Sequence, residues 1–242
     1  MLPTIAGIIA RRLLVNFRVD PEVAQQHLPS GVRLKLHKGY GVAGICLIRL
    51  ERMHPAFLPL SVGLSSENAA HRYAVTYRSE NGETDGVYIP RRDTNSRLTQ
   101  LLGGKLVPGT HHAATFQVDD HDGRIGFAMD SDDEESRVRV VGTESVKLPS
   151  SSIFESLDES STFFEGGASG LSDRAQSDGH DQVELVIDGW EVRPFDVEMV
   201  QSSYFDDENR FPTGSAVFDH ALIMRDMRHQ WRSRARYVAS HR

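Results

Sequence analysis

The chain has 242 residues, 39% of them hydrophobic and 25% charged, enough for one large domain or two small ones with a substantial core. Its 34 acidic and 27 basic side chains give a formal net charge of -7, which disfavours a nucleic-acid-binding protein. Cys46 is the only cysteine, which excludes an intramolecular disulfide and favours a reducing compartment.

The N-terminal segment does not resemble a secretory signal. Residues 2–10 are mildly apolar, but Arg11 and Arg12 follow this stretch, whereas a signal peptide carries its positive charges first. The stretch is too short to span a bilayer, and no later stretch reaches that length. We therefore expect a cytoplasmic protein that binds neither nucleic acid nor membrane and needs no metal or cofactor. A homo-oligomer is compatible with the sequence.

The first third of the chain predicts strands and one short helix. Residues 21–28 predict the helix, because Asp20 can cap it and Pro21 occupies its first position. Residues 31–36 and 40–53 predict strands. The second run is too continuously apolar for a half-exposed strand, so we expect it to be buried on both faces and to emerge into solvent near its end.

The next elements predict a hairpin and a second helix. Residues 70–78 alternate in polarity, Asn81-Gly82 is a strong hairpin turn, and residues 86–90 form the return strand. Residues 93–102 predict a short helix capped by Asp93.

The centre of the chain predicts a second hairpin. Its strands are residues 111–118 and 124–129, joined by the acidic turn 119–123. A further strand is expected over 138–141 and a helix over 151–164.

The last third contains a polar segment between apolar ones. Residues 166–181 are rich in glycine and predict a mobile loop. Residues 183–203 resume strand character, and 216–231 predict a helix or a strand, with moderate agreement with helical spacing. Many short strands with two or three helices indicate an α+β, β-rich barrel or sandwich rather than βαβ winding.

Three motifs favour structural interpretations. Residues 39–44 match G-x-G-x-x-G but open a strand instead of a helix, so we expect flexible glycines at a strand entry. His111 and His112 are adjacent on a strand and point to opposite faces, which argues against one shared metal ion. One of the two is expected to point into a barrel interior, where it would form hydrogen bonds or act in acid–base chemistry. Residues 130–135 lack the spacing of a calcium loop and predict a solvated acidic hairpin tip.

A carboxylate, an amide and paired arginines recur near two strand ends. Glu67 and Asn68 precede one strand, and Arg92 and Asp93 close another. This composition is typical of a pocket for a small anion or a carbonyl compound. An ion pair combined with a helix cap at Asp93 is the alternative, and the sequence leaves both open.

Only four lysines occur among the basic residues, so amine chemistry has few candidates. Lys35 and Lys38 flank a turn, and Lys147 lies in a loop. Lys105 follows Gly103-Gly104 in an irregular segment. A lysine forms a Schiff base when burial or a neighbouring cation lowers its pKa. The alternative for Lys105 is a solvated loop position.

Several segments resemble one known family. They are SENAAHR (66–72), GVYIPRRD (86–93), LGGK (102–105) with PGTHH (108–112), the opening segment 19–34, and the later segments 202–205 and 218–225. Together they resemble the YqjF-like family, domain of unknown function 2071, which is grouped with acetoacetate decarboxylase-like proteins. The resemblance implies one α+β domain over 1–242, built on a closed or partly closed antiparallel or mixed β-barrel with an internal small-molecule cavity.

The resemblance also implies roles for single residues. In acetoacetate decarboxylase a lysine forms a Schiff base, a second adjacent lysine lowers its pKa, and an arginine and a glutamate line the cavity. Lys105 falls near the place of the first lysine, and Glu67 near that of the cavity glutamate. Leu106 follows Lys105, so the activating second lysine is missing.

We therefore hold three hypotheses. The leading one is a barrel protein that binds a small carbonyl compound or carboxylate through Asn68, Arg92, Asp93 and His111, either as a sensor or for chemistry. The second is a decarboxylase-like lyase with Lys105 as nucleophile and Glu67 as acid–base group. The third is an interaction protein whose arginine-rich tail, 225–242, contacts an acidic partner or its own acidic turn.

Overall fold

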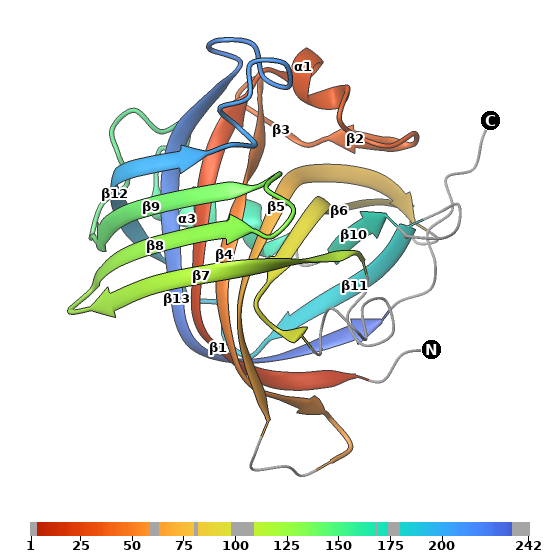
Figure 1. Ribbon diagram of the computed structural model, residues 1–242. Coiled ribbons are helices and arrows are strands. Elements are labelled where there is room, and N and C mark those ends of the chain that lie inside the picture. Colours follow the sequence, from red (N-terminus) through yellow and green to blue (C-terminus); the bar gives the residue numbers. More distant parts are fainter. Residues whose placement is uncertain are drawn as a thin grey trace.

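A computed structural model describes residues 4–58, 63–79, 82–97, 109–167, 169–173 and 180–233. One sheet of 13 strands dominates it, accompanied by short helices (Figure 1). In these ranges no helix is long and apolar enough to cross a membrane.

Two helices lie entirely within these ranges, α1 (Pro21–Gln25) and α3 (Leu157–Glu165). The strands are β1 (Ile5–Val19), β2 (Val32–Leu34), β3 (Leu36–His37), β4 (Tyr40–Pro55), β5 (Leu64–Ser79), β6 (Gly82–Thr94), β7 (His111–His121), β8 (Arg124–Ser131), β9 (Arg137–Glu144), β10 (Ser169–Asp173), β11 (His180–Ile187), β12 (Arg193–Ser202) and β13 (Ala216–Ser233).

The sheet closes on itself twice. Its order is β11-β10-β6-β7-β8-β9-β12-β13-β1-β4-β5-β2, and two further pairings join β6 to β5 and β11 to β13. The first pairing closes a large ring, β6-β7-β8-β9-β12-β13-β1-β4-β5, and the second closes a small ring, β11-β10-β6-β5-β4-β1-β13 (Figure 1). Strands β6, β5, β4, β1 and β13 belong to both rings, and we call them the shared wall.

The shared wall is buried on both faces, which explains its continuous apolar runs. In β4, Ile45 and Leu47 belong to the core of the large ring, whereas Cys46 and Ile48 belong to a second core on the small-ring side. Alternate residues of a strand point to opposite faces, so each face needs its own apolar set. The prediction of a strand buried on both faces over 40–53 is confirmed.

The mixed pairing also agrees with the prediction of an α+β barrel. β6 pairs in parallel with β7 and with β10, and the other pairings are antiparallel. Because the sheet closes twice, few strand edges are exposed. Exposed edges are a liability of β proteins, since they can pair with other chains.

Both helices begin with a side-chain cap, and the one at Asp20 is the cap that the sequence predicts. The Asp20 carboxylate accepts from the backbone N–H of Glu22 at 2.8 Å, and Pro21 opens α1. Ser156 caps α3 in the same way. Both helices are shorter than predicted: α1 ends at Gln25, and α3 covers only the second part of 151–164.

The sheet corrects two expectations and decides a third that the sequence left open. Asp93 does not cap a helix, because it lies in β6, paired with Ala69 and His112; residues 98–102 of the predicted helix lie outside the described ranges. Part of the predicted loop 166–181 is strand, since β10 pairs with β11. Of the two alternatives for residues 216–231, the structure shows the strand, β13, whose apolar run fits helical spacing because both of its faces are covered.

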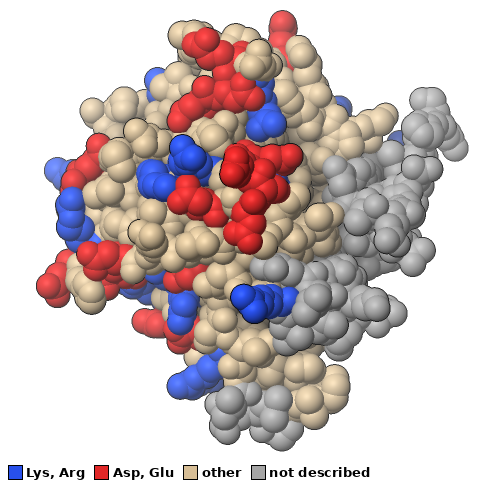
Figure 2. Space-filling view, viewed as in Figure 1, with Lys and Arg blue, Asp and Glu red and all other residues tan. Residues whose placement is uncertain are grey.

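Charged side chains lie in mixed clusters on the face seen in Figure 2. Surface pairs link strands of the sheet: Arg139 of β9 pairs with Asp130 of the adjacent β8 at 2.7 Å, and Arg124 of β8 pairs with Glu198 of β12 across β9. The predicted acidic tip 130–135 is partly structural, because Asp133 accepts from the buried Arg91 at 2.7 Å.

A histidine is buried in the large ring without hydrogen bonds. His71 is 0% exposed, stacks on Tyr204 at a centroid distance of 4.5 Å, and has no partner for either ring nitrogen within the described chain. Burial, reinforced by the charges of Arg91 and Arg210, lowers its pKa from 6.5 to about 3. The ring is therefore neutral in the folded protein at pH 7.

We expect this histidine to make the fold sensitive to acid. The unfolded chain binds a proton at position 71 below about pH 6.5, while the folded protein does not until about pH 3. The stabilising contribution is complete above pH 6.5 and falls by up to about 1.4 kcal/mol per pH unit below it. Urea unfolding at pH 7.5 and 5.0 should show a smaller loss for His71→Phe than for the wild type.

His121→Gln is the control, because this ring is exposed at a hairpin tip. An equal acid loss in the wild type and His71→Phe would contradict the assignment.

Candidate functional site

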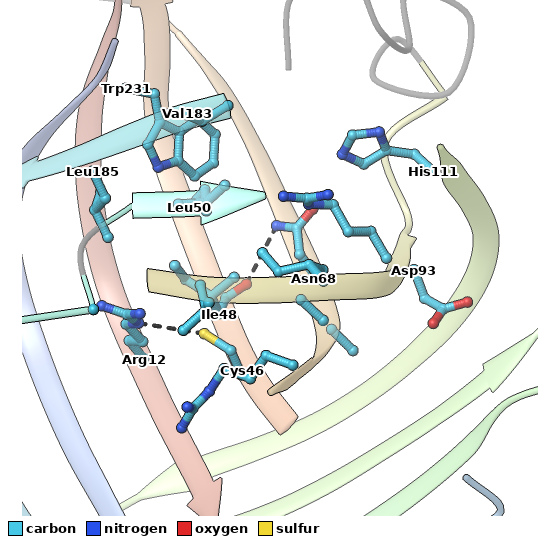
Figure 3. A pocket seen from close by; sticks show the side chains of 18 residues that line it. Arg12, Cys46, Ile48, Leu50, Asn68, Asp93, His111, Val183, Leu185 and Trp231 are labelled. Atoms are coloured by element: carbon cyan, nitrogen blue, oxygen red, sulfur yellow. Dashed lines mark hydrogen bonds between the residues drawn. The ribbon is translucent and has the colours of Figure 1, made fainter. Parts of the chain in front are cut away.

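The small ring encloses a cavity of about 140 Å³ (Figure 3). Every strand of that ring contributes to its lining: Arg12 (β1), Cys46 (β4), Asn68 (β5), Arg92 (β6), Gly170 (β10), Val183 (β11) and Trp231 (β13). Most of the lining is apolar, and the polar groups are few: Arg12, Asn68, Arg72, Arg92, Asp93 and His111. An apolar cavity with a small number of placed polar groups is the usual form of a small-molecule site.

Arg72 is a buried cation without a counterion. Its residue exposure is 3%, and among the described residues no carboxylate forms an ion pair with it. Its guanidinium donates to Asn16 Oδ1 and lies 4.9 Å from the ring centroid of Phe164, while its Nε has no partner. Burial lowers the pKa of Arg72 to about 10, so the side chain stays charged at neutral pH.

A row of residues across the shared wall holds Arg72. Gly44 of β4 stands between Arg72 on β5 and Asn16 on β1, and Asn16 in turn faces His220 on β13. A side chain at Gly44 has no room, because its Cβ would lie 2.3 Å from the Val15 carbonyl oxygen. The glycine expected only to loosen a strand entry therefore lets two polar side chains meet across β4.

Hydrogen bonds fix the polarity of this row. Because Asn16 Oδ1 accepts from Arg72, its amide nitrogen faces His220 Nε2, at 3.2 Å. On its other side, Nδ1 of His220 donates to the Asp219 carboxylate at 2.6 Å. Ser160 of α3 also contacts Nε2, at 2.8 Å. The side chains of Asn16 and His220 thus separate Arg72 from the Asp219 carboxylate.

Arg12 is a second cation near Arg72. Its Nε donates to Cys46 Sγ at 3.3 Å (Figure 3), and its guanidinium lies 5.9 Å from the ring centroid of Trp190. No described carboxylate forms an ion pair with Arg12 either. The charge of Arg12 contributes to lowering the pKa of Arg72, as expected for two neighbouring cations.

Asn68 and Asp93 line the cavity but are bound by the protein itself. The Asn68 amide nitrogen donates to the Ile48 carbonyl and to Ser66, and its oxygen accepts from Thr94 at 2.8 Å. The Asp93 carboxylate pairs with Arg91 at 2.8 Å. Both side chains therefore brace the strands around the cavity.

His111 and Arg92 lie at the other side of the cavity. Arg92 donates to the Ser172 hydroxyl. Burial, and then the charge of Arg92, lowers the pKa of His111 to about 3, so its ring is neutral. His112 points away from the cavity and pairs with Asp133 at 2.8 Å. The expectation that the two histidines face opposite sides, one of them inward, agrees with this geometry.

Glu67 is not among the residues that line this cavity. It lies on the opposite face of β5 from Asn68, where it pairs with Arg11 at 2.6 Å and Arg49 at 3.6 Å. Burial raises its pKa, against the opposing effect of Arg11. Asp120, in the predicted acidic turn, accepts from Arg225 at 2.8 Å. One arginine of the predicted tail therefore contacts the acidic turn of its own chain.

Lys105 lies outside the described residues, as do 234–242 of the predicted tail. The cavity thus brings together Asn68, Arg92, Asp93 and His111 from the predicted set. Sequence reasoning missed Arg12 and Arg72. A signal for Arg72 was present, because residues 70–78 alternate in polarity and Arg72 is one of the polar positions. The same pattern, however, fits an arginine that faces solvent. In the described part of the chain no cluster of His, Cys, Asp and Glu could hold a metal ion.

Comparison with known proteins identifies the family. Residues 9–174 match the model of domain of unknown function 2071, described as an uncharacterized conserved protein. The chain belongs to this family. Among curated proteins no sequence matches it.

Solved structures of acetoacetate decarboxylase-like proteins share the fold. Acetoacetate decarboxylase from Legionella pneumophila is 10% identical, with a TM-score of 0.61 over 98% of this chain and 89% of that one. An acetoacetate decarboxylase-like enzyme from Sphingomonas wittichii RW1 is 12% identical, with a TM-score of 0.57 over 97% and 91%. The enduracididine biosynthesis enzyme MppR, in complex with pyruvate, is 11% identical, with a TM-score of 0.56 over 99% and 91%. The acetoacetate decarboxylase-like fold is therefore established for this chain.

We expect Glu67 to stabilise the fold without contributing to the cavity. Glu67→Gln leaves Arg11 with only the more distant Asp120, at 3.5 Å, and breaking a buried ion pair costs about 3 kcal/mol. Chemical denaturation should show that loss, while small carboxylates should bind the folded variant as they bind the wild type.

Glu51→Gln is the matched control, because Glu51 forms an exposed pair with Arg49 that is worth less than about 1 kcal/mol. A stable Glu67→Gln variant that no longer binds carboxylates would place Glu67 in the site after all.

Proposed function

We propose that the protein binds a small carboxylate or carbonyl compound in the small-ring cavity, with the anionic group held by Arg12 and Arg72. The observation that carries the proposal is the burial of Arg72 without a carboxylate partner. An unpaired buried charge costs several kcal/mol, and an anionic ligand would recover much of that cost. Charge-assisted hydrogen bonds from a planar guanidinium suit a carboxylate particularly well.

The fold supports the same ligand class. MppR, which shares this fold, has been solved in complex with pyruvate, a small oxo acid. The apolar lining of the cavity, including Ile48, Leu50 and Leu185, would accommodate the carbon skeleton while the guanidiniums hold the charge.

We expect small carboxylates to raise the melting temperature of the protein, because they bind the folded state. The corresponding neutral amides should not. Arg72→Met should weaken carboxylate binding about tenfold or more, the value of one charge-assisted hydrogen bond. Isothermal titration calorimetry measures the affinity of each variant.

Arg49→Met is the matched control, since Arg49 stands on the shared wall but pairs with Glu67 on its other side. Equal binding of acids and amides by the wild type would refute the proposal even if Arg72→Met did not fold.

A Schiff-base enzyme is the second candidate. The observation that favours it is the position of Lys105 in the sequence, between Asp93 and His111, both of which line the cavity. In such an enzyme the lysine amine would condense with a ligand ketone, releasing water and forming an imine.

Borohydride reduces an imine to a stable secondary amine, so trapping tests the second candidate. With a panel of 2-oxo and 3-oxo acids, an imine-forming enzyme would gain the ligand mass on the Lys105 peptide, and Lys105→Ala would gain none. If the protein binds the same acids but Lys105 stays unmodified, the Schiff-base candidate is refuted and the binding function remains.

A further inference from the structure

His111 has a hydrogen-bonding direction that the protein itself sets. Its Nδ1 lies 3.2 Å from the carbonyl oxygen of Gly109. A carbonyl oxygen can only accept, so Nδ1 carries the proton and donates it. The assignment of the proton to Nδ1 follows from the hydrogen-bond geometry alone. Whether Nε2 donates or accepts then depends on the charge of the ring.

The ring is neutral, so Nε2 is an acceptor. Burial and the adjacent Arg92 both oppose a second proton on His111. Nε2 forms no hydrogen bond with any residue in the described chain. Figure 3 shows the His111 ring directed toward the cavity, on the opposite side from Arg12. The cavity thus offers a vacant acceptor at one side and unpaired cations at the other.

Because of the charges around the cavity, we expect the ligand group that donates to His111 Nε2 to be neutral. Arg12 and Arg72 on one side, and Arg92 beside His111 on the other, are cations, and an ammonium group in the same cavity would be repelled by them. Asp93 is the only carboxylate among the described lining residues, and Arg91 already neutralises it. A hydroxyl group is the simplest neutral donor, and it carries no charge penalty on entry.

We propose that the ligand is a hydroxy acid whose carboxylate binds Arg12 and Arg72 and whose hydroxyl, at the far end of the carbon chain, donates to His111 Nε2. This inference rests on the proposed function and adds the functional group at the other end of the ligand. The apolar side chains between the two ends, among them Ile48 and Leu50, contact the carbon chain. A hydroxyl next to the carboxylate would lie at the cationic side and would not reach His111.

Calorimetry with acids of matched chain length tests this directly on the wild-type protein. The series comprises the ω-hydroxy acid, its methyl ether, the unsubstituted acid and the dicarboxylate. We expect the hydroxy acid to bind about five- to tenfold more tightly than the other three, because only its terminal group donates a hydrogen bond at neutral pH. Equal or tighter binding of the unsubstituted acid or the dicarboxylate would overturn the inference and leave carboxylate binding intact.

A pair of neighbouring variants locates the effect. His111→Phe removes the acceptor and should abolish the preference for the hydroxy acid while the unsubstituted acid keeps its affinity. His112→Phe is the matched control, because His112 faces Asp133 outside the cavity, and it should keep the preference. A preference that survives His111→Phe would overturn the inference. Failure of all four acids to bind the wild type would instead refute the proposed function.

Discussion

The structure depends on one wall of strands that is buried on both faces. Strands β6, β5, β4, β1 and β13 close a large ring on one side and a small ring on the other. Side chains such as Phe127 and Val140 form the core of the large ring. The small ring is not filled completely, and its cavity is the candidate site. Successive side chains of the wall therefore point alternately toward the core of the large ring and toward the small ring that holds the cavity.

The two sides of the wall treat charge differently. On the large-ring side, Arg11 and Glu67 form a close pair, and Arg225 is held by Asp120. On the small-ring side, Arg12 and Arg72 have only neutral partners among the described residues. Buried cations with matched carboxylates are structural, whereas buried cations without them store an unfavourable energy that an anion can release. This contrast locates the site more sharply than the shape of the cavity does.

The row Arg72–Gly44–Asn16–His220 shows how the shared wall holds Arg72 in place without a counterion. Register places these residues side by side on consecutive strands, and the missing side chain of Gly44 lets Arg72 reach Asn16. The side chains of Asn16 and His220 then separate Arg72 from the Asp219 carboxylate. The guanidinium is oriented without being neutralised, which is what a preorganised anion site requires.

The sequence by itself determined the fold class and the location of several lining residues. Continuous apolar runs at 40–53 predicted a strand buried on both faces, and adjacent His111 and His112 predicted opposite orientations, because both inferences rest on the two-residue period of a strand. The family resemblance supplied the acetoacetate decarboxylase-like fold. Tertiary structure alone decided which face of β5 meets the cavity, so Glu67 lies outside it and Arg72 inside. It also decided that Asp93 lies within strand β6 instead of capping a helix, since pairing with β5 and β7 outweighs its capping propensity. Whether an arginine forms an ion pair depends on how strands far apart in the chain align with one another, and the local sequence does not specify that alignment.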